Sequence, residues 1–127
     1  MMNYPENLKY TSEHEWLREE NGEAVVGVTE FAQKELGDIV FVDIDTEGET
    51  LAAGEKFGTI EAVKTVSDLY MPVSGTVLAV NAALETAPET INKDPYGEGW
   101  MIRIQLTHPA ELNGLLSAAD YEDFTNE

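Results

Sequence analysis

The residues of this chain that could carry chemistry are few. Lys64 is a single amine between two acids, Glu61 on its N-terminal side and Asp68 on its C-terminal side, and His14 and Glu15 are adjacent near the start of the chain. On its own, Lys64 is best interpreted as a surface lysine, because lysine side chains are mostly exposed. The two acids beside it are then explained equally well as groups that only keep the surface hydrated.

Several kinds of site are excluded or unsupported. The chain has no cysteine, which excludes disulfides, thiolate zinc sites and a cysteine nucleophile. Its two histidines, His14 and His108, lie far apart in the sequence and do not indicate a metal site, and His108 precedes Pro109 at an expected helix start, where a structural role is expected. No Ser-His-Asp spacing is apparent, and the ten glycines are scattered among turns rather than gathered in a phosphate-binding loop.

The charge is strongly one-sided, with 25 acidic and 7 basic residues among 127 and a formal net charge of −18. Such a surface repels nucleic acid and anionic lipid, since phosphate binding needs clustered Lys and Arg. It favours transient contacts with basic clefts on protein partners, although acidity that only maintains solubility explains the composition equally well. No apolar run approaches the roughly 18 residues of a membrane span, and the start of the chain has no signal-peptide pattern. We expect a monomer in the cytoplasm of a prokaryote, and a mature mitochondrial form fits equally.

Short apolar runs separated by turn residues predict a β-rich fold. The expected strands cover residues 15–17, 24–28, 39–44, 56–60, 75–80 and 101–106, as in a sandwich or a partly closed barrel. Thr29 is placed to cap a short helix through Leu36 that Gly37 would end in the left-handed conformation. We expect one domain over residues 1–127 with a helical tail at about 109–125. In this tail Pro109 would begin one helix, carrying Leu112, Leu115 and Leu116, and Ser117 would cap a second piece with Tyr121 and Phe124 on one side.

The segment that contains Lys64 has a different pattern. Ile60, Val63, Val66 and Tyr70 lie close to helical spacing, and the segment has no Asn-Gly or Asp-Gly to mark a tight hairpin. Periodicity alone therefore favours a helix over residues 60–70.

The same segment carries a resemblance to a known family. The motif Gly58-Thr-Ile-Glu61-Ala-Val-Lys64-Thr-Val-Ser-Asp68-Leu-Tyr70, followed by Pro72-Val-Ser-Gly75, is similar to the lysine hairpin of lipoyl carriers, and specifically to the H proteins of the glycine cleavage system. Biotin carriers typically flank the lysine with methionines, and lipoyl domains of 2-oxo-acid dehydrogenases place an Asp before it, whereas this chain has Val63 and Thr65. The resemblance extends over nearly the whole chain. It includes Lys9-Tyr10, His14-Glu-Trp16, Gly27-Val-Thr-Glu-Phe-Ala-Gln33, Leu36-Gly-Asp-Ile-Val-Phe-Val42 and Asn92-Lys-Asp-Pro-Tyr-Gly-Glu-Gly-Trp-Met101.

This resemblance implies a sandwich-like hybrid barrel of the lipoyl/biotinyl-carrier type, with Lys64 at the tip of a β-hairpin, and so overrides the helical interpretation. It implies a non-catalytic carrier with lipoate in an amide on Lys64, attached by a lipoate ligase or a lipoyl/octanoyl transferase. A pyridoxal-phosphate glycine decarboxylase would load an aminomethyl group on the arm and release carbon dioxide. A tetrahydrofolate-dependent aminomethyltransferase would remove the one-carbon unit and ammonia, and a dihydrolipoyl dehydrogenase would reoxidise the dithiol.

The resemblance also implies a surface cleft near the N-terminal motif that shelters the loaded arm. Glu15 and Asp68 would pair there with the cationic amine. Glu61 and Asp68, which flank Lys64, would either guide the ligase or a partner or only keep the surface hydrated. His14 is either an arm contact or a packing residue, and Glu13 stands at a position where family members vary. For Trp16 we expect packing onto the core. The segment 92–101 forms either a partner-facing loop or a connection closed by Trp100 packing inward.

Two other functions remain open at this point. The first is a further role as a lipoyl relay, in which the same lysine passes lipoate to other lipoyl-dependent enzymes. The second is an unmodified acidic module that binds a basic protein partner, for which Lys64 would be dispensable.

Overall fold

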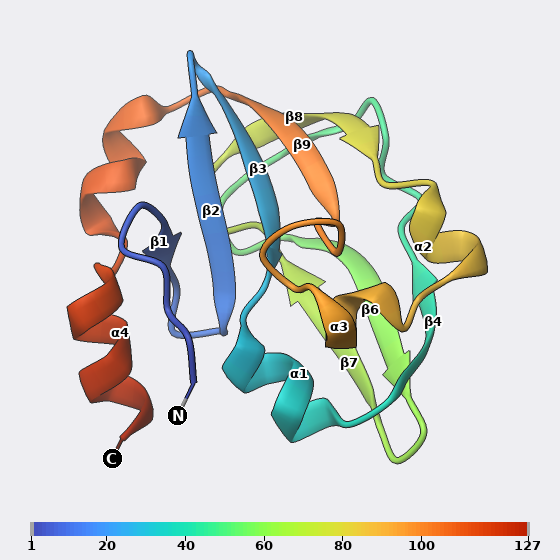
Figure 1. The fold of residues 1–127 in the computed structure, drawn as a ribbon. Coiled ribbons are helices and arrows are strands. Elements are labelled where there is room, and N and C mark those ends of the chain that lie inside the picture. Colours follow the sequence, from blue (N-terminus) through green and yellow to red (C-terminus); the bar gives the residue numbers. More distant parts are fainter. Residues whose placement is uncertain (1, 127) are drawn as a thin grey trace.

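In the computed structural model, which describes residues 2–126, nine strands form two antiparallel sheets (Figure 1). The larger sheet has the strand order β1 (Lys9–Tyr10), β2 (Glu15–Glu20), β3 (Glu23–Val28), β9 (Ile102–Leu106), β8 (Gly75–Val80) and β5 (Thr50–Leu51). The smaller sheet has the order β4 (Ile39–Asp43), β6 (Lys56–Ala62) and β7 (Val66–Tyr70). Within the described residues the strands remain in two sheets rather than one closed barrel, so the predicted mainly β, sandwich-like fold is confirmed.

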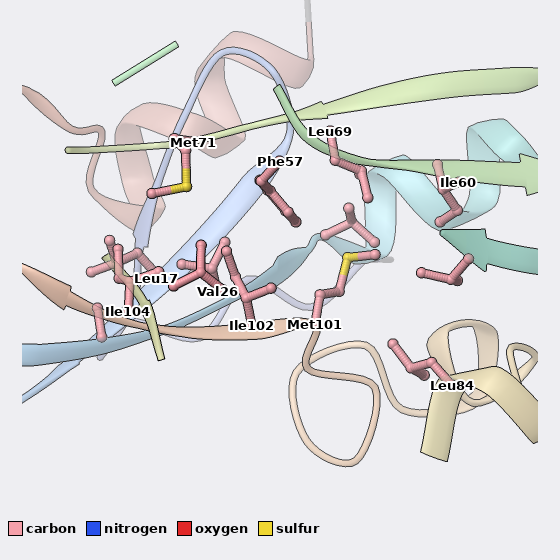
Figure 2. Packing of buried hydrophobic residues seen from close by; sticks show 14 of the residues in the cluster. Leu17, Val26, Phe57, Ile60, Leu69, Met71, Leu84, Met101, Ile102 and Ile104 are labelled. Atoms are coloured by element: carbon pink, nitrogen blue, oxygen red, sulfur yellow. The ribbon is translucent and has the colours of Figure 1, made fainter. Parts of the chain in front are cut away.

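The main core lies between the two sheets (Figure 2). Phe57, Ile60 and Leu69 from the smaller sheet are buried with side chains of the larger sheet that include Val26 and Ile102. β3 is buried on both faces, because Val25 on its other face belongs to a second cluster with Leu8, Tyr10, Trp16 and Tyr121. The larger sheet is therefore covered on both sides, which explains why β3 is apolar at consecutive positions instead of alternating.

The β2–β3 hairpin follows directly from its sequence. Asn21 and Gly22 both have positive φ, 53° and 85°, as a two-residue type I′ turn requires. Glu20 is consequently paired with Glu23, and the register continues to Glu15 opposite Val28. The hairpin thereby fixes which face of the sheet receives Trp16.

Within residues 2–126, five short helices connect or end the strands. α1 (Glu30–Leu36) begins after Thr29, whose hydroxyl accepts the Ala32 N–H (3.1 Å), and it ends at Gly37, where φ is 82° and ψ is −156°. The cap prediction is confirmed, although this ψ lies outside the left-handed helical region expected for Gly37. The others are α2 (Ala83–Thr86), α3 (Thr90–Lys93), the 3₁₀ helix η1 (Pro109–Gly114) and α4 (Ala118–Thr125). Among residues 2–126, none of the helices is long and apolar enough to cross a membrane.

Two expectations drawn from local patterns are wrong. Residues 60–70 do not form a helix: they lie in β6, a turn and β7, and the apolar positions Val63 and Val66 that suggested a helix are exposed. The first tail helix stops at Gly114, so Leu115 and Leu116 lie beyond it. Leu115 is extended there, and Leu116 exchanges two backbone hydrogen bonds with Tyr10 (2.9 and 2.8 Å), which is more consistent with a strand-like bridge than with a helical turn.

Candidate functional site

Lys64 lies in the turn of the β6–β7 hairpin. Glu61 of β6 is paired with Val66 of β7, and the turn is closed by the Ala62 N–H, which donates to the Thr65 carbonyl oxygen (2.8 Å). Among the described non-glycine residues only His14 and Asn21 have positive φ, so this turn needs no Asn-Gly or Asp-Gly. This explains why local turn chemistry did not predict it.

The turn is held to the rest of the molecule by the segment that follows α1. The Val63 N–H donates to the carbonyl oxygen of Asp38 (3.0 Å). The Lys64 side chain extends over Gly37, close enough for a Cβ at that position to lie 3.6 Å from Cε. The backbone of the turn is thus held in place, and the Lys64 side chain is exposed. Figure 1 shows the β6–β7 turn as a projecting loop at one end of the smaller sheet.

Asn92 joins the elements beneath the hairpin. Its Oδ1 accepts the Ile39 N–H (2.9 Å), and its Nδ2 donates to Gln33 Oε1 (3.0 Å) and to the Gly37 carbonyl oxygen (2.9 Å). One side chain from α3 therefore ties the end of α1 to the start of β4. Sequence analysis had placed Asn92 only in a loop motif, and no local pattern identifies a residue whose partners are 53 to 59 positions away.

A cleft of about 140 Å³ separates the N-terminal segment from α1 and β7, and we call it the hairpin cleft. It combines apolar walls with several acids. Its lining residues are Glu13, His14, Glu15, Val28, Ala32, Glu35, Leu36, Ile60, Ser67, Asp68 and Leu69. Because β7 is an edge strand of its sheet, one side of the hairpin is open to this cleft.

Glu15 is the buried acid of the cleft. Only 2% of its surface is exposed, and its carboxylate accepts the Tyr70 N–H at Oε2 (3.1 Å) and the Thr11 hydroxyl at Oε1 (3.1 Å). Burial raises the pKa of Glu15 to about 7, against the opposing effect of these two hydrogen bonds. Glu15 therefore links β7 to the N-terminal segment through hydrogen bonds. With a pKa of about 7, its protonated and ionised forms are both populated at neutral pH.

His14 is directed mainly toward packing partners. Its Nδ1 lies 2.8 Å from the Tyr121 hydroxyl, which is also 2.8 Å from Thr29 Oγ1, and its ring lies against Phe31 with the centroids 4.7 Å apart. Burial lowers the pKa of His14 and favours the neutral ring. Of the two interpretations left open for this residue, the contacts favour packing, although His14 also contributes to the lining of the cleft.

The remaining acids of the hairpin occupy different places. Asp68 lines the hairpin cleft and forms an ion pair with Lys56 (3.3 Å). Glu61 is exposed and does not line the cleft; it is paired with Phe41 on one side and Val66 on the other. The structure therefore brings Glu15 and Asp68 to one cleft, whereas Glu61 is not among the lining residues of that cleft.

Comparisons with known proteins agree with this geometry. The family model for the glycine cleavage H-protein matches residues 8–127. The chain belongs to this family. It is 60% identical over 125 residues to the glycine cleavage system H protein of Bacteroides fragilis, covering 98% of the chain and 99% of the relative. It is 57% identical over 124 residues to that of Salinibacter ruber, covering 98% of the chain and 100% of the relative.

A solved structure supports the family assignment independently. The crystal structure of a glycine cleavage system H protein from Mycobacterium marinum superimposes with a TM-score of 0.89 at 40% identity, and the match covers 97% of this chain and 99% of that one. The resemblance drawn from the sequence is confirmed, as is its precedence over the helical pattern at residues 60–70.

Both tryptophans of the H-protein motifs pack inward, to different degrees. Trp16 is fully buried, and its Nε1–H donates to the Pro95 carbonyl oxygen (2.9 Å), so the packing role expected for it is confirmed. Trp100 is half-buried against the same cluster, and Met101 after it is fully buried. Of the two interpretations of segment 92–101, the contacts favour a connection closed by Trp100. His108 is exposed at the start of η1.

Proposed function

We propose that the chain is the lipoyl-carrying shuttle of the glycine cleavage system and that Lys64 carries the lipoyl group in an amide. The observation that supports this most directly is the position of Lys64 at the tip of the β6–β7 hairpin, on a backbone fixed by the Ala62 and Val63 hydrogen bonds. Membership in the H-protein family supports the same role. The partners are then the decarboxylase, aminomethyltransferase and dihydrolipoyl dehydrogenase of this system, met by a monomer in the cytoplasm.

The residues around Lys64 fit such a group. No ion pair involves Lys64 within the described part of the chain, so no partner of that kind has to be displaced when the amine is acylated. Bound lipoate supplies a dithiolane that can be opened, loaded and reoxidised, while the protein supplies position and shelter.

The hairpin cleft gives the protein a means to hold the loaded end of the arm. Its apolar walls, which include Ala32 and Leu36, exclude water, and Glu15 and Asp68 supply acceptors for a cationic amine. A cation near Glu15 favours the carboxylate form, opposing the burial that raises its pKa to about 7. A cationic amine held in the cleft would therefore favour ionised Glu15, with its proton released to solvent.

The site assignment is tested by the intact mass after incubation with a lipoate ligase, lipoate and ATP. We expect the parent protein to gain the mass of one lipoyl group and Lys64→Arg to gain none. Lys56→Arg is the matched control, because Lys56 lies on the same hairpin but is paired with Asp68, and this variant should be modified like the parent. Absence of a gain in the parent, with a ligase that modifies a known acceptor, would reject Lys64 and favour the unmodified binding module.

The system assignment requires a second measurement. Lipoylated parent protein should support glycine decarboxylation when combined with the pyridoxal-phosphate decarboxylase, and Lys64→Arg treated in the same way should not. Equal activity of the two proteins would show that the arm is not on Lys64. Transfer of the lipoyl group from the parent to an apo-dehydrogenase would add the relay role to the shuttle role.

A further inference from the structure

Exposed apolar side chains are concentrated on β4 and around the β6–β7 turn, beside Lys64. Within residues 2–126, four of the six exposed large hydrophobic residues lie on β4 or at the β6–β7 turn. They are Val40 (48% exposed), Phe41 (53%), Val63 (75%) and Val66 (59%). Soluble monomers usually expose large apolar residues singly. A group of neighbouring exposed apolar residues therefore indicates an interaction surface.

A β-bulge in β4 creates this arrangement. Ile39 is paired with Ala62 and Phe41 with Glu61, so Val40 is an extra residue in the ladder. In a regular strand Phe41 would face the core together with Ile39. The bulge instead leaves both Val40 and Phe41 exposed and returns Val42 to the core. Bulges commonly redirect side chains next to functional sites.

The pairing aligns these residues into one row across the sheet. Phe41 is opposite Glu61, and Glu61 is opposite Val66. Directly paired residues share a face, and adjacent strands are about 4.8 Å apart, so Phe41 and Val66 lie roughly 10 Å from each other with Glu61 between them. Val66 begins β7, two positions after Lys64. The row is therefore immediately adjacent to the lysine.

The charges of this face are acidic. The neighbouring row of the sheet contains Asp43, Thr59 and Asp68, of which Asp68 is paired with Lys56. Phe41 also forms a wall of a recess of about 300 Å³ whose lining includes Ile44 and Leu84 together with the acids Asp43 and Glu85. A complementary partner presents apolar side chains surrounded by Lys and Arg.

We propose that this face, formed by Val40, Phe41, Glu61, Val63 and Val66, is the docking surface for the enzyme that acylates Lys64. The inference rests on the proposed function. Acylation joins the neutral Lys64 nitrogen to the carbonyl carbon of an activated acyl group, such as the mixed anhydride of an acyl adenylate. The bond between that carbon and the phosphate oxygen breaks, AMP leaves, and the nitrogen gives up one proton. Lys64 Nζ itself must enter that enzyme's active site, so the enzyme must cover the side chains next to the lysine. Enzymes that act at the far end of the arm are not required to approach so closely.

The test compares two exposed phenylalanines in the full chain. Phe41→Ser is the test variant, and Phe124→Ser is the matched control, because Phe124 is 43% exposed on α4, away from the hairpin (Figure 1). Initial rates of lipoyl transfer are followed by intact mass at increasing protein concentration. We expect kcat/KM to fall about tenfold or more for Phe41→Ser, mainly through KM, as for an interface anchor, and to remain unchanged for Phe124→Ser.

Two further variants separate a lost contact from a lost fold. Val66→Thr keeps the side-chain shape on an exposed strand position and should lower kcat/KM by about threefold or more through KM, since a smaller apolar contact is lost. Asp43→Asn should weaken the salt dependence of KM, whereas Glu19→Gln on β2 should not. Thermal unfolding of each variant confirms that it is folded under the assay conditions.

The outcomes distinguish this inference from the proposed function. If the parent is acylated on Lys64 and folded Phe41→Ser and Val66→Thr are acylated at the parent rate, the docking surface is refuted while the carrier site stands. If acylation is normal but decarboxylation with the lipoylated variants is slowed, the face belongs to the decarboxylase and the inference is likewise overturned. If the parent is not acylated at all, the proposed function fails, and this inference fails with it.

Discussion

At the α4 end of the molecule, Tyr121 is fully buried, stacks on Tyr10 with ring centroids 4.8 Å apart, and holds His14 and Thr29 through its hydroxyl. At the hairpin end, Val63 is 75% exposed and backbone hydrogen bonds from Ala62 and Val63 hold the turn. Figure 1 shows these two regions on different sides of the sheets. The aromatic cluster fixes the segment that carries Glu15, whereas the hairpin presents side chains to other molecules. We therefore expect substitutions in the first region to change the stability and those in the second to change only recognition.

The largest effect is expected for Trp16→Ala. The indole is completely buried, and its ring lies so close to Gly27 that a Cβ there would be 2.7 Å from it. Removing the ring leaves a cavity and an unpaired Pro95 carbonyl oxygen, and should lower the free energy of unfolding by about 3–5 kcal/mol. Urea denaturation measures the loss. Trp100→Ala, at a half-buried position, should cost clearly less, and equal losses would contradict the assigned core.

Glu15→Gln should change how stability depends on pH. Burial raises the pKa of Glu15 from 4.5 to about 7, so the folded protein keeps a proton that the unfolded chain releases between these values. The stability contributed by protonated Glu15 is full below pH 4.5 and is lost as the pH rises through 7. At roughly 1.4 kcal/mol per unit of pKa, the variant should gain about 3 kcal/mol relative to the parent between pH 4.5 and 8.

This pH effect is measured by urea denaturation at several pH values. Glu61→Gln, which removes an exposed carboxylate, controls for the loss of one acid. A difference between Glu15→Gln and the parent that stays constant from pH 4.5 to 8 would show that the pKa of Glu15 is the same in the folded protein and in the unfolded chain.

A smaller effect is expected for Tyr121→Phe. The ring packing is kept, and only the hydroxyl that bridges His14 Nδ1 and Thr29 Oγ1 is removed. Loss of these buried hydrogen bonds should lower the free energy of unfolding by about 1–2 kcal/mol. Thermal unfolding of the variant, with Tyr4→Phe as a half-buried aromatic control, measures the difference. An unchanged melting temperature would mean that His14 and Thr29 find other partners.

The smallest effect is expected at the hairpin tip. Val63→Ser and Lys64→Gln replace exposed side chains whose neighbours are mostly solvent, so each should change the free energy of unfolding by less than about 0.5 kcal/mol. The same denaturation experiment applies. A loss above 1 kcal/mol for either variant would remove the contrast between the two regions, because it would make the tip part of the structural core.

The success of sequence-based prediction also differed between these regions. Strands with apolar runs and clear turns, such as β3 after Asn21-Gly22, were predicted within a residue, since the information is local. The hairpin at Lys64 was not predicted by local pattern, because its turn uses ordinary backbone angles and its exposed valines imitate a helical stripe. Only the resemblance of the whole motif placed it correctly.

Contacts between distant segments were beyond prediction from the sequence. The burial of Glu15 depends on β7, which lies 55 residues further along the chain, and the direction of His14 depends on Tyr121, 107 residues away. The bulge that exposes Phe41 has no glycine or proline to mark it. In each case the tertiary structure determines the role of the residue, and the local sequence contains no signal for that role.

The hydrogen bond from the Val63 N–H to the Asp38 carbonyl oxygen has a consequence for the motion of any group attached to Lys64. Because this bond joins the turn to the segment after α1, rotations within the side chain and the attached group would contribute more to the volume that the group sweeps than movement of the turn. A smaller swept volume raises the local concentration of the arm's end at the mouth of the hairpin cleft. If Lys64 carries the arm as proposed, return of the arm to the cleft would be a first-order event that competes directly with capture by a partner.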